Sequence, residues 1–331
     1  MKFKRSAAIA AAALLALTAC SDNGKSAGSA PKENAAAAAA DKLQTKFVTI
    51  ATGGASGPYN ILATSLAEAY TKEFGVNSKT QTTGASVENI NLINQKKAEM
   101  AFVMSDVLSD AVNGQNSFKE KIGSVSQIAA LYPNYVQVVA SAKSGIKTLE
   151  DLRGKRVAVG AQNSGVEVNA RNLINGFGMT YDDLKIDYLG YAEAADALKA
   201  GKIDAAFLTS GLPNSSLMEL QQGFDLQLVS IPADKIREIA KDKPYFVAMN
   251  IPKGTYGNAE DIPTAAIRNA LVVSSELSED DVYKLTKSFF ANLGVLQTAH
   301  QAAKEIDPAT AKEGFVAPMH PGAKKYFDEA K

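Results

Sequence analysis

Cysteine and histidine are scarce in this chain. Among 331 residues there are one cysteine, Cys20, and two histidines, His300 and His320. A zinc site needs three or four His, Cys or carboxylate ligands at suitable spacing, and the sequence contains no such group. The scarcity also argues against thiol chemistry and against a histidine-based triad, while carboxylate and lysine chemistry stay open. We therefore expect no metal and no cofactor.

An excess of positive charge is also missing. The chain has 35 basic residues (lysine plus arginine) and 35 acidic residues (aspartate plus glutamate). Loss of Lys2, Lys4 and Arg5 with a signal segment would leave the acidic residues in slight excess. Binding to nucleic acid needs clustered Lys and Arg that neutralise phosphates. The sequence thus predicts no nucleic-acid partner.

Long apolar runs are absent after the first 20 residues, so we expect no membrane span there. The N-terminus has a basic start and an apolar run from Ala7 to Ala19, shorter than the roughly 20 residues of a spanning helix, which is typical of a signal peptide. The run ends in Leu17-Thr18-Ala19-Cys20, which resembles a bacterial lipobox. We predict a lipoprotein signal peptide over 1–19 with lipidation of Cys20, the alternative being an ordinary cleaved signal with a chance cysteine.

A polar stretch follows the cysteine. Residues 20–46 are poor in large apolar side chains and are expected to form a flexible tether to the membrane. The remaining chain, in a sequence that is 46% hydrophobic, is long enough for two cored α/β lobes. The folded part is expected to begin near Phe47.

A module of strand, glycine-rich loop and helix occurs twice. Phe47–Ile50 is β-rich, the loop ATGGASG follows, and Pro58 suits the first position of a helix because its missing N–H costs nothing there. Val157–Val159, the loop GAQNSG and a second helix repeat this order. Each module continues to a second strand, and Met100–Ser105 aligns without a gap on Ala205–Ser210.

Alternating strands and helices predict an α/β fold with mainly parallel sheets. The extended run Leu131–Ala140 and a second extended region over 245–273 would cross between two lobes and make a two-crossing hinge. We predict lobe 1 over 47–138, completed by 251–331, and lobe 2 over 139–250. The alternative is one large sheet with an insertion.

The glycine loops that lead into helices are candidate ligand sites. First-turn backbone N–H groups have no partner within a helix, and the macrodipole adds about half a positive charge, so such loops favour anions. Ser86 and Ser164 are expected to be helix N-caps, Ser164 with Glu167 as a capping box. The alternative for each serine is a cap that touches no ligand, and neither loop matches a P-loop or a dinucleotide fingerprint.

Several long segments together resemble one known family. They are TGGASGPYN, TTGASVENI, FVMSD, ALYPNYVQVVA, SGIKTLEDLRGKRVAVGAQNSGVEVNAR, YAEAADALKAGKIDAAF and DDVYKLTKSFFANL. This set, from about Phe47 to Phe327, resembles the TAXI-type solute-binding proteins of TRAP transporters. The resemblance implies a type II periplasmic-binding-protein fold, an extracytoplasmic location, and delivery of a dicarboxylate or glutamate-like amino acid to a TRAP permease driven by an ion gradient.

The resemblance also implies a set of ligand contacts. They are Gly54, Ser56, Gly57, Tyr59, Ser86, Val87, Asn89, Ser105, Asp106, Tyr135, Asn163, Ser164, Gly165, Thr209 and Ser210. The chain departs from the family at Asn60, where a second aromatic is common, and at Tyr135, where a proline is common. The loops also lack an arginine to clamp a carboxylate, and Arg171 is the nearest basic candidate, since Arg153 and Arg156 are expected at the surface.

Two other functions fit the same fold. Delivery to an ATP-driven importer, or ligand sensing by a lipoprotein, would use the same cleft. An enzyme of this fold would need a charged pair with shifted pKa values in the cleft. The loops offer Asp106, Glu88 and Glu167 but no histidine or lysine partner, so we predict a binding protein without catalytic residues.

Overall fold

The computed structural model of the protein describes residues 42–330. The predicted signal peptide, the lipidated Cys20 and most of the tether lie outside these residues. The first strand starts at Phe47, where the folded part was expected to begin. Within residues 42–330, no helix is both long enough and apolar enough to cross a membrane.

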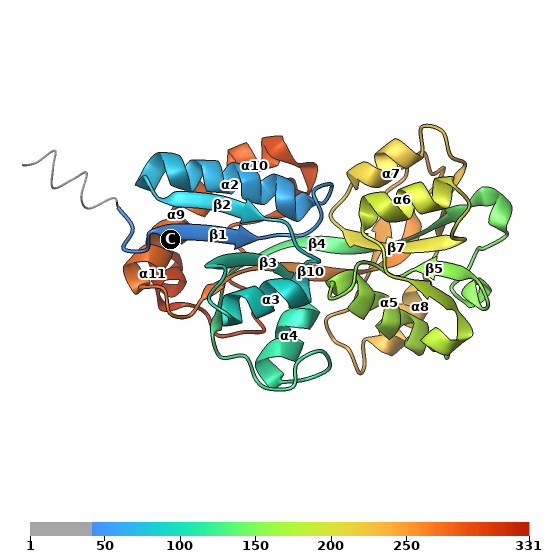
Figure 1. Ribbon diagram of the computed structural model, residues 1–331, viewed down its shortest axis with the longest axis horizontal. Helices are drawn as coiled ribbons and strands as arrows, with labels where there is room; N and C mark the ends of the chain where they lie inside the picture. Colours follow the sequence, from blue (N-terminus) through green and yellow to red (C-terminus); the bar gives the residue numbers. More distant parts are fainter. Residues whose placement is uncertain (1–41, 331) are drawn as a thin grey trace, which may run out of the picture. The chain divides into compact units, whose positions relative to one another are not determined.

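Strands and helices alternate along most of the described chain (Figure 1). The strands are β1 Phe47–Ala51, β2 Asn77–Gln81, β3 Met100–Met104, β4 Val125–Ser141, β5 Arg156–Ala158, β6 Lys185–Asp187, β7 Ala205–Ser210, β8 Leu226–Val229, β9 Val247–Ile251 and β10 Ile262–Ser274. The α-helices are α2 Pro58–Phe74, α3 Ser86–Asn94, α4 Ser105–Asn113, α5 Gly165–Gly176, α6 Tyr191–Lys199, α7 Ser215–Leu220, α8 Ala233–Ile239, α9 Glu279–Ala291, α10 Leu293–Ala299 and α11 Pro321–Glu329. Short 3₁₀ turns cover Ala142–Ser144, Glu150–Leu152, Tyr181–Asp183 and Gln301–Glu305.

Helix α2 shows how the first module folds. Its N-cap Gly57 is extended and Pro58 takes the first helical position, as predicted. Leu62, Leu66 and Tyr70 recur at a spacing of four and are fully buried, so one stripe of the helix packs into the core. Burial of each such leucine contributes about 1.5–3 kcal/mol. The helix ends at Gly75, whose φ of 64° suits a residue without Cβ.

The sheet is mixed, with strand order β2-β1-β3-β10-β4-β7-β5-β6. The outer pairs β1–β2, β1–β3, β5–β6 and β5–β7 are parallel, as expected from the repeated modules. The two long strands β4 and β10 pair antiparallel with each other and with their other neighbours. The expectation of mainly parallel sheets therefore holds for the outer strands, and the crossing strands make the whole sheet mixed.

Strands β4 and β10 are the two crossings. β4 pairs with β10 over Val125–Tyr135 and then with β7 over Tyr135–Ala140. β10 pairs with β9 in its first half and with β3 in its second half. We call the part built on β1–β3 lobe 1, with α2–α4 and α9–α11. The part built on β5–β9 is lobe 2, with α5–α8.

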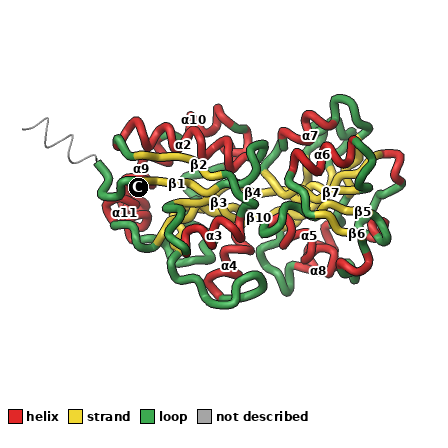
Figure 2. The backbone as a smooth tube through the Cα atoms, viewed as in Figure 1, coloured by secondary structure: helices red, strands yellow, loops and turns green. Residues whose placement is uncertain are grey.

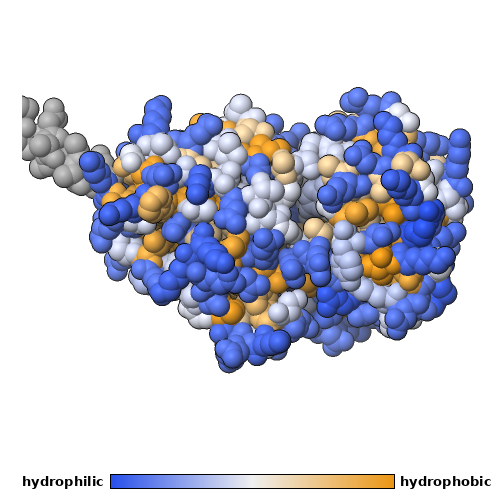
Figure 3. Space-filling view, viewed as in Figure 1, coloured by the Kyte–Doolittle hydropathy of each residue, from blue (hydrophilic) through white to orange (hydrophobic). Residues whose placement is uncertain are grey.

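Helices cover both faces of the sheet (Figure 2). One buried apolar cluster lies under α2, α9 and α10, and a second lies under α6 and α7. A third cluster is continuous from Val107 and Leu108 of α4 to Val168 and Leu173 of α5, so it joins the two lobes. On the face seen in Figure 3, apolar residues fall in small separate groups among hydrophilic ones.

Candidate ligand-binding site

A cavity of about 410 Å³ lies between residues of lobe 1 and lobe 2. Its volume is within the roughly 300–1,000 Å³ of small-molecule pockets. The lining residues are Gly53, Gly54, Ala55, Ser56, Gly57, Pro58, Tyr59, Thr83, Gly84, Ala85, Met104, Asn134, Ala161, Ser164, Val166, Gly190, Tyr191, Ala192, Glu193 and Ser210. The cavity thus lies at the carboxyl ends of the strands, where open α/β sheets bind ligands.

Four helices begin at this cavity. Their N-cap residues Gly57 (α2), Ala85 (α3), Ser164 (α5) and Gly190 (α6) all belong to the lining. The first backbone N–H groups of a helix have no intrahelical partner, and each N-terminus carries about half a positive charge. Two helix starts from each lobe therefore make the cavity favourable for an anionic group.

Glycine allows the two lobes to approach at Gly57. A Cβ there would lie 3.3 Å from the ring of Tyr191 on the other lobe and 3.3 Å from the Gly54 carbonyl oxygen. Ala85 is the opposite case, because it keeps a side chain at φ 87° and ψ −143°. That region is essentially confined to glycine, and an alanine held there stores about 1–3 kcal/mol of strain.

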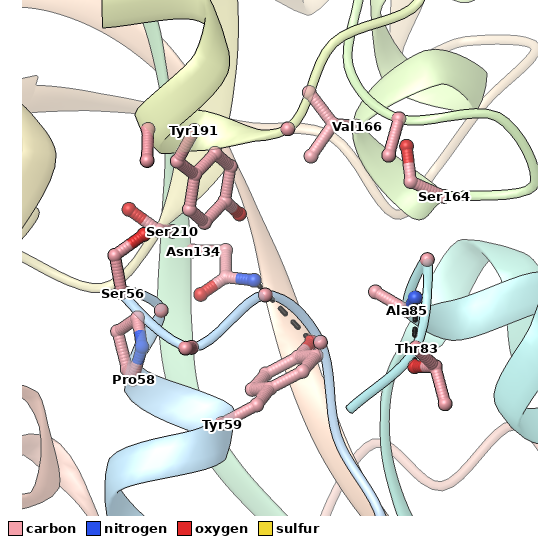
Figure 4. A pocket seen from close by; sticks show the side chains of 18 of the residues that line it. Ser56, Pro58, Tyr59, Thr83, Ala85, Asn134, Ser164, Val166, Tyr191 and Ser210 are labelled. Atoms are coloured by element: carbon pink, nitrogen blue, oxygen red, sulfur yellow. Dashed lines mark hydrogen bonds between the residues drawn. The ribbon is translucent and has the colours of Figure 1, made fainter. Parts of the chain in front are cut away.

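Two tyrosines from opposite lobes form part of the lining, and both hydroxyls are already used. Tyr59 donates to Asn269 Oδ1 and accepts from Asn134 Nδ2 at 3.4 Å, the bond drawn in Figure 4. Tyr191 donates to the Thr209 carbonyl oxygen at 2.6 Å. Burial raises the pKa of both phenols, so they stay neutral. Each ring is thereby fixed and presents mainly its apolar surface to the cavity.

Glu193 is the one charged side chain among the lining residues. It is exposed, and its Oε2 accepts from the Gly190 N–H at 2.9 Å. Arg171, the nearest basic candidate, pairs with Glu167 and lies outside the lining. Arg153 and Arg156 lie at the surface, as predicted, paired with aspartates. An anion in the cavity would be held by amides and hydroxyls.

The cavity brings together part of the predicted set. Gly54, Ser56, Gly57, Tyr59, Ser164 and Ser210 line it. Ser164 also caps α5, since its Oγ accepts from the Glu167 N–H at 3.1 Å. The expected reciprocal bond of a capping box does not form, because the Glu167 carboxylate binds Arg171 and Tyr181.

Nine predicted contacts lie outside the lining: Ser86, Val87, Asn89, Ser105, Asp106, Tyr135, Asn163, Gly165 and Thr209. The expectation that Ser86 is the N-cap of α3 is wrong, because Ala85 takes that position. Ser86 Oγ instead accepts from the Met104 N–H at 3.1 Å. Asn89 is fully buried and donates to carbonyl oxygens of Thr52 and Phe102.

The aligned serines Ser105 and Ser210 are not equivalent. Helix α4 begins directly at Ser105, so Met104, the last residue of β3, lines the cavity in lobe 1. In lobe 2, strand β7 continues to Ser210, which lines the cavity, and Thr209 is buried. Successive side chains of a strand point to opposite faces of the sheet, so a shift of one residue moves a side chain to the other face. The ungapped alignment of the two strands could not reveal such a shift.

Several of the remaining residues join the lobes. Asn163, at φ 61°, accepts through its carbonyl oxygen from the Glu88 N–H of α3 at 3.3 Å. Asp106 accepts from Asn169 of α5 at 2.6 Å. A further interlobe bond runs from Ser215 Oγ to the Ser56 carbonyl oxygen at 2.6 Å. The two lobes therefore touch around the cavity.

Sequence reasoning missed the start of α6. Gly190, Tyr191 and Glu193 form the fourth helix N-terminus of the site. A signal was present, because Gly190 precedes an amphipathic helix and Glu193 stands at its third position, where a carboxylate can reach back to the N-cap amide. Asn134 and Thr83 were missed as well, and their types and positions gave no comparable signal.

Comparison with known proteins adds a family and a fold. A model of the NMT1-like family matches residues 50–330. Similar structures include a binding protein component of an ABC phosphonate transporter from Pseudomonas aeruginosa (12% identity, 80% of this chain and 80% of that one, TM-score 0.53). PhnD1 from Prochlorococcus marinus, in complex with methylphosphonate, is also similar (13% identity, 79% and 88%, TM-score 0.51). A Bordetella bronchiseptica protein matches at 19% identity over 87% and 83%, with TM-score 0.52. At these identities the likeness concerns the fold, and it confirms the predicted two-lobe periplasmic-binding-protein fold.

Proposed function

The chain belongs to the NMT1-like family, and from this premise we propose that it is an extracytoplasmic solute-binding receptor that captures a small carboxylate between its lobes and delivers it to a membrane transporter. The observation that carries the proposal is the convergence of four helix N-termini, two from each lobe, on one cavity. A ligand that contacts both lobes stabilises their closed arrangement by its differential contacts, and no bond need be broken.

The composition of the lining narrows the ligand. Among the lining residues no lysine or arginine is present, and the one carboxylate is Glu193. A dicarboxylate and a glutamate-like amino acid both carry two carboxylates, but only the amino acid has an ammonium group that can pair with Glu193. Of the two carboxylate classes that the resemblance implies, a glutamate-like amino acid, with its ammonium group, therefore fits better than a dicarboxylate.

The kind of transporter follows from the resemblance to TAXI proteins, which favours a TRAP permease driven by an ion gradient. A second candidate is an ATP-driven importer, because similar structures include a component of an ABC phosphonate transporter. In either case we propose that lipidated Cys20 anchors the receptor to the membrane. Uptake that survives ATP depletion but stops when the ion gradient is dissipated would favour the TRAP assignment.

A catalytic role has little support at this site. Proton transfer needs an acid and a base held within hydrogen-bond reach of the reacting group. Glu193 is the single carboxyl group of the lining, and its partner there is the Gly190 amide. We therefore propose a binding function without catalytic residues.

A thermal-shift panel on the full chain tests the proposal. Matched compounds would be L-glutamate, C4–C6 dicarboxylates, methylphosphonate, methanesulfonate, neutral amino acids, sugars and nucleotides. At about 100 times the dissociation constant, binding adds roughly 2.7 kcal/mol, which raises the melting temperature by roughly 5 °C or more. A shift limited to carboxylates supports the proposal. A shift limited to methylphosphonate or methanesulfonate would mean that the ligand is a phosphonate or a sulfonate instead of a carboxylate. No shift with any compound would contradict the proposed capture of a small carboxylate.

A further inference from the structure

Helices α4 and α5 meet between the lobes at one buried polar pair. Asn169 Nδ2 of α5 donates to Asp106 Oδ2 of α4 at 2.6 Å, and both side chains have no exposed surface. Val107 and Val168, the neighbours of these two residues along the helices, belong to the apolar cluster that joins the lobes. The pair is thus a polar contact inside an apolar interlobe contact, outside the ligand cavity.

The two side chains leave one oxygen each without a partner. In the described part of the chain, neither Asp106 Oδ1 nor Asn169 Oδ1 has a hydrogen-bond partner. An ionised carboxylate only accepts, so it cannot satisfy the amide oxygen. A protonated carboxyl has one O–H donor and would satisfy both remaining oxygens at once. Exchange of the amide oxygen and nitrogen would place the amide oxygen 2.6 Å from Asp106 Oδ2, and two acceptors at this distance would also need a proton between them.

We propose that Asp106 is protonated when the lobes are closed and that its O–H donates to Asn169 Oδ1, so that lobe closure takes up one proton. The proposal rests on the proposed function in one respect, namely that the two lobes open and close. Asp106 is then a positioning residue, which affects ligand affinity through the closed state without touching the ligand.

The surroundings of Asp106 support the neutral form. The pKa of Asp106 is raised to about 7, mainly by burial and also by the charge of Asp110, one turn along α4. The backbone amides of Val107 and Asp106 and the bond from Asn169 lower it, but no backbone amide forms a hydrogen bond with Oδ1.

No cation among the surrounding groups bonds to Asp106. Among the elements packed on α4, β3 has no ionisable side chain, whereas α3 has Glu88, α5 has Glu167 and Arg171, and β10 has Arg268. Tyr59 and Tyr245 also interact with Asp106, and Lys243 interacts with Asp110. Arg171 pairs with Glu167, and Arg171 and Lys243 lower the pKa of Asp110. Desolvation by burial is therefore the main cause of the raised pKa of the Asp106 carboxyl.

The expected pH dependence follows from the raised pKa. In open lobes Asp106 faces water, and its pKa should be near the ordinary value of about 3.9. The closed state then binds more protons than the open state between about pH 4 and pH 7. The ratio of closed to open molecules should fall by up to about tenfold per pH unit as pH rises through this range, and should level off above about pH 7.

A distance measurement between the lobes tests this without any ligand. Spin labels would be attached to cysteines introduced at two exposed positions, Lys72→Cys in α2 and Lys199→Cys in α6. Cys20→Ser in the full chain removes the native cysteine. Double electron–electron resonance then reports the populations of closed and open molecules. In this labelled background, the protein with Asp106 unchanged should lose closed molecules between pH 5 and pH 7. Asp106→Asn keeps both a donor and an acceptor towards Asn169 but does not titrate, so its closed fraction should not change with pH.

Asp110→Asn is the matched control, because Asp110 is on the same helix, is also buried, and forms no bond to Asn169. Its closed fraction should still fall as pH rises, but the fall should be complete at a somewhat lower pH, because the charge of Asp110 no longer raises the pKa of Asp106. A closed fraction that is constant from pH 5 to 8 with Asp106 present, or a pH dependence that persists in Asp106→Asn, would overturn the proposal. Because no ligand is used, failure of the carboxylate panel and failure of the proton proposal are distinguishable.

Discussion

Substitution of Gly84 by alanine should weaken ligand binding although Gly84 need not touch the ligand. Gly84 lies in the loop before α3, and a Cβ at this position would be 2.7 Å from the backbone oxygen of Gln162 on the other lobe. A Cβ essentially never lies within 3.0 Å of another heavy atom, and a backbone oxygen cannot turn aside as a flexible side chain does. The two loops must therefore separate before the lobes can close.

The size of the effect follows from the clash. Overpacking by a methyl group in a well-packed contact costs about 1–3 kcal/mol. This cost falls on the closed state alone, because Gln162 is distant when the lobes are apart. At 1.4 kcal/mol for each factor of ten, affinity should fall by roughly 5- to 150-fold. Folding of lobe 1 should be unaffected or slightly more stable, since the backbone of Gly84 is not in the left-handed region.

Isothermal titration with the ligand from the panel would measure the affinity of Gly84→Ala. Gly54→Ala is the matched control, because Gly54 lines the same cavity and a Cβ there would meet nothing within 4 Å. Both variants should unfold at the same denaturant concentration as the unchanged protein, or slightly above it. If Gly84→Ala binds as tightly as Gly54→Ala, ligand binding does not require the approach of the two loops, and the reasoning fails.

Three further substitutions test other parts of the site. Ala85→Gly should raise the free energy of unfolding by about 1–3 kcal/mol because it removes the strain at φ 87°, and an unchanged or lower value in urea denaturation would contradict this. Ser164→Asp should keep the cap of α5 but repel an anion, so that carboxylate affinity is lost while the free energy of unfolding stays within about 0.5 kcal/mol. Ser164→Ala should instead lower the free energy of unfolding by about 1 kcal/mol because the cap is lost. Unchanged carboxylate affinity in Ser164→Asp would exclude an anion near α5. Tyr59→Phe should lower the free energy of unfolding by about 1–3 kcal/mol, because the buried Asn269 Oδ1 loses its donor. Tyr188 is exposed, so Tyr188→Phe should lower it very little. Equal urea midpoints for the two variants would contradict this.

The elements of the fold were predictable where one local rule decided them. Pro58 after a glycine loop places the start of α2, and the buried spacing of Leu62 and Leu66 places its inner face. The extended run around Val136 correctly predicted the crossing strand β4, because its continuous apolar character fits a strand buried on both faces. Antiparallel pairing of β4 with β10 was not predictable, since pairing partners far apart in sequence leave no local pattern.

The site was predictable only where the loops come directly from the repeated module. Gly57 and Ser164 were found because glycine and serine before a helix have a local meaning. Asn163 was expected to touch ligand but bonds to the other lobe, and Asn134 was overlooked although it lines the cavity. Both depend on how the two lobes meet, which is set by contacts between segments about 75 residues apart or more, such as Glu88 and Asn163.

The cavity is lined by helix N-termini and by no cationic side chain, so its affinity for an anion depends mainly on backbone amides. Only substitution by proline removes a backbone amide, so replacing one hydroxyl, such as that of Ser56, removes one donor among several. Positions that control how closely the lobes approach, such as Gly84 and Gly165, act on all the amide contacts together. At Gly165 a Cβ would lie 2.8 Å from Met104 Sδ across the lobes. Affinity should therefore be more sensitive to a methyl group added between the lobes than to a hydroxyl removed from the cavity.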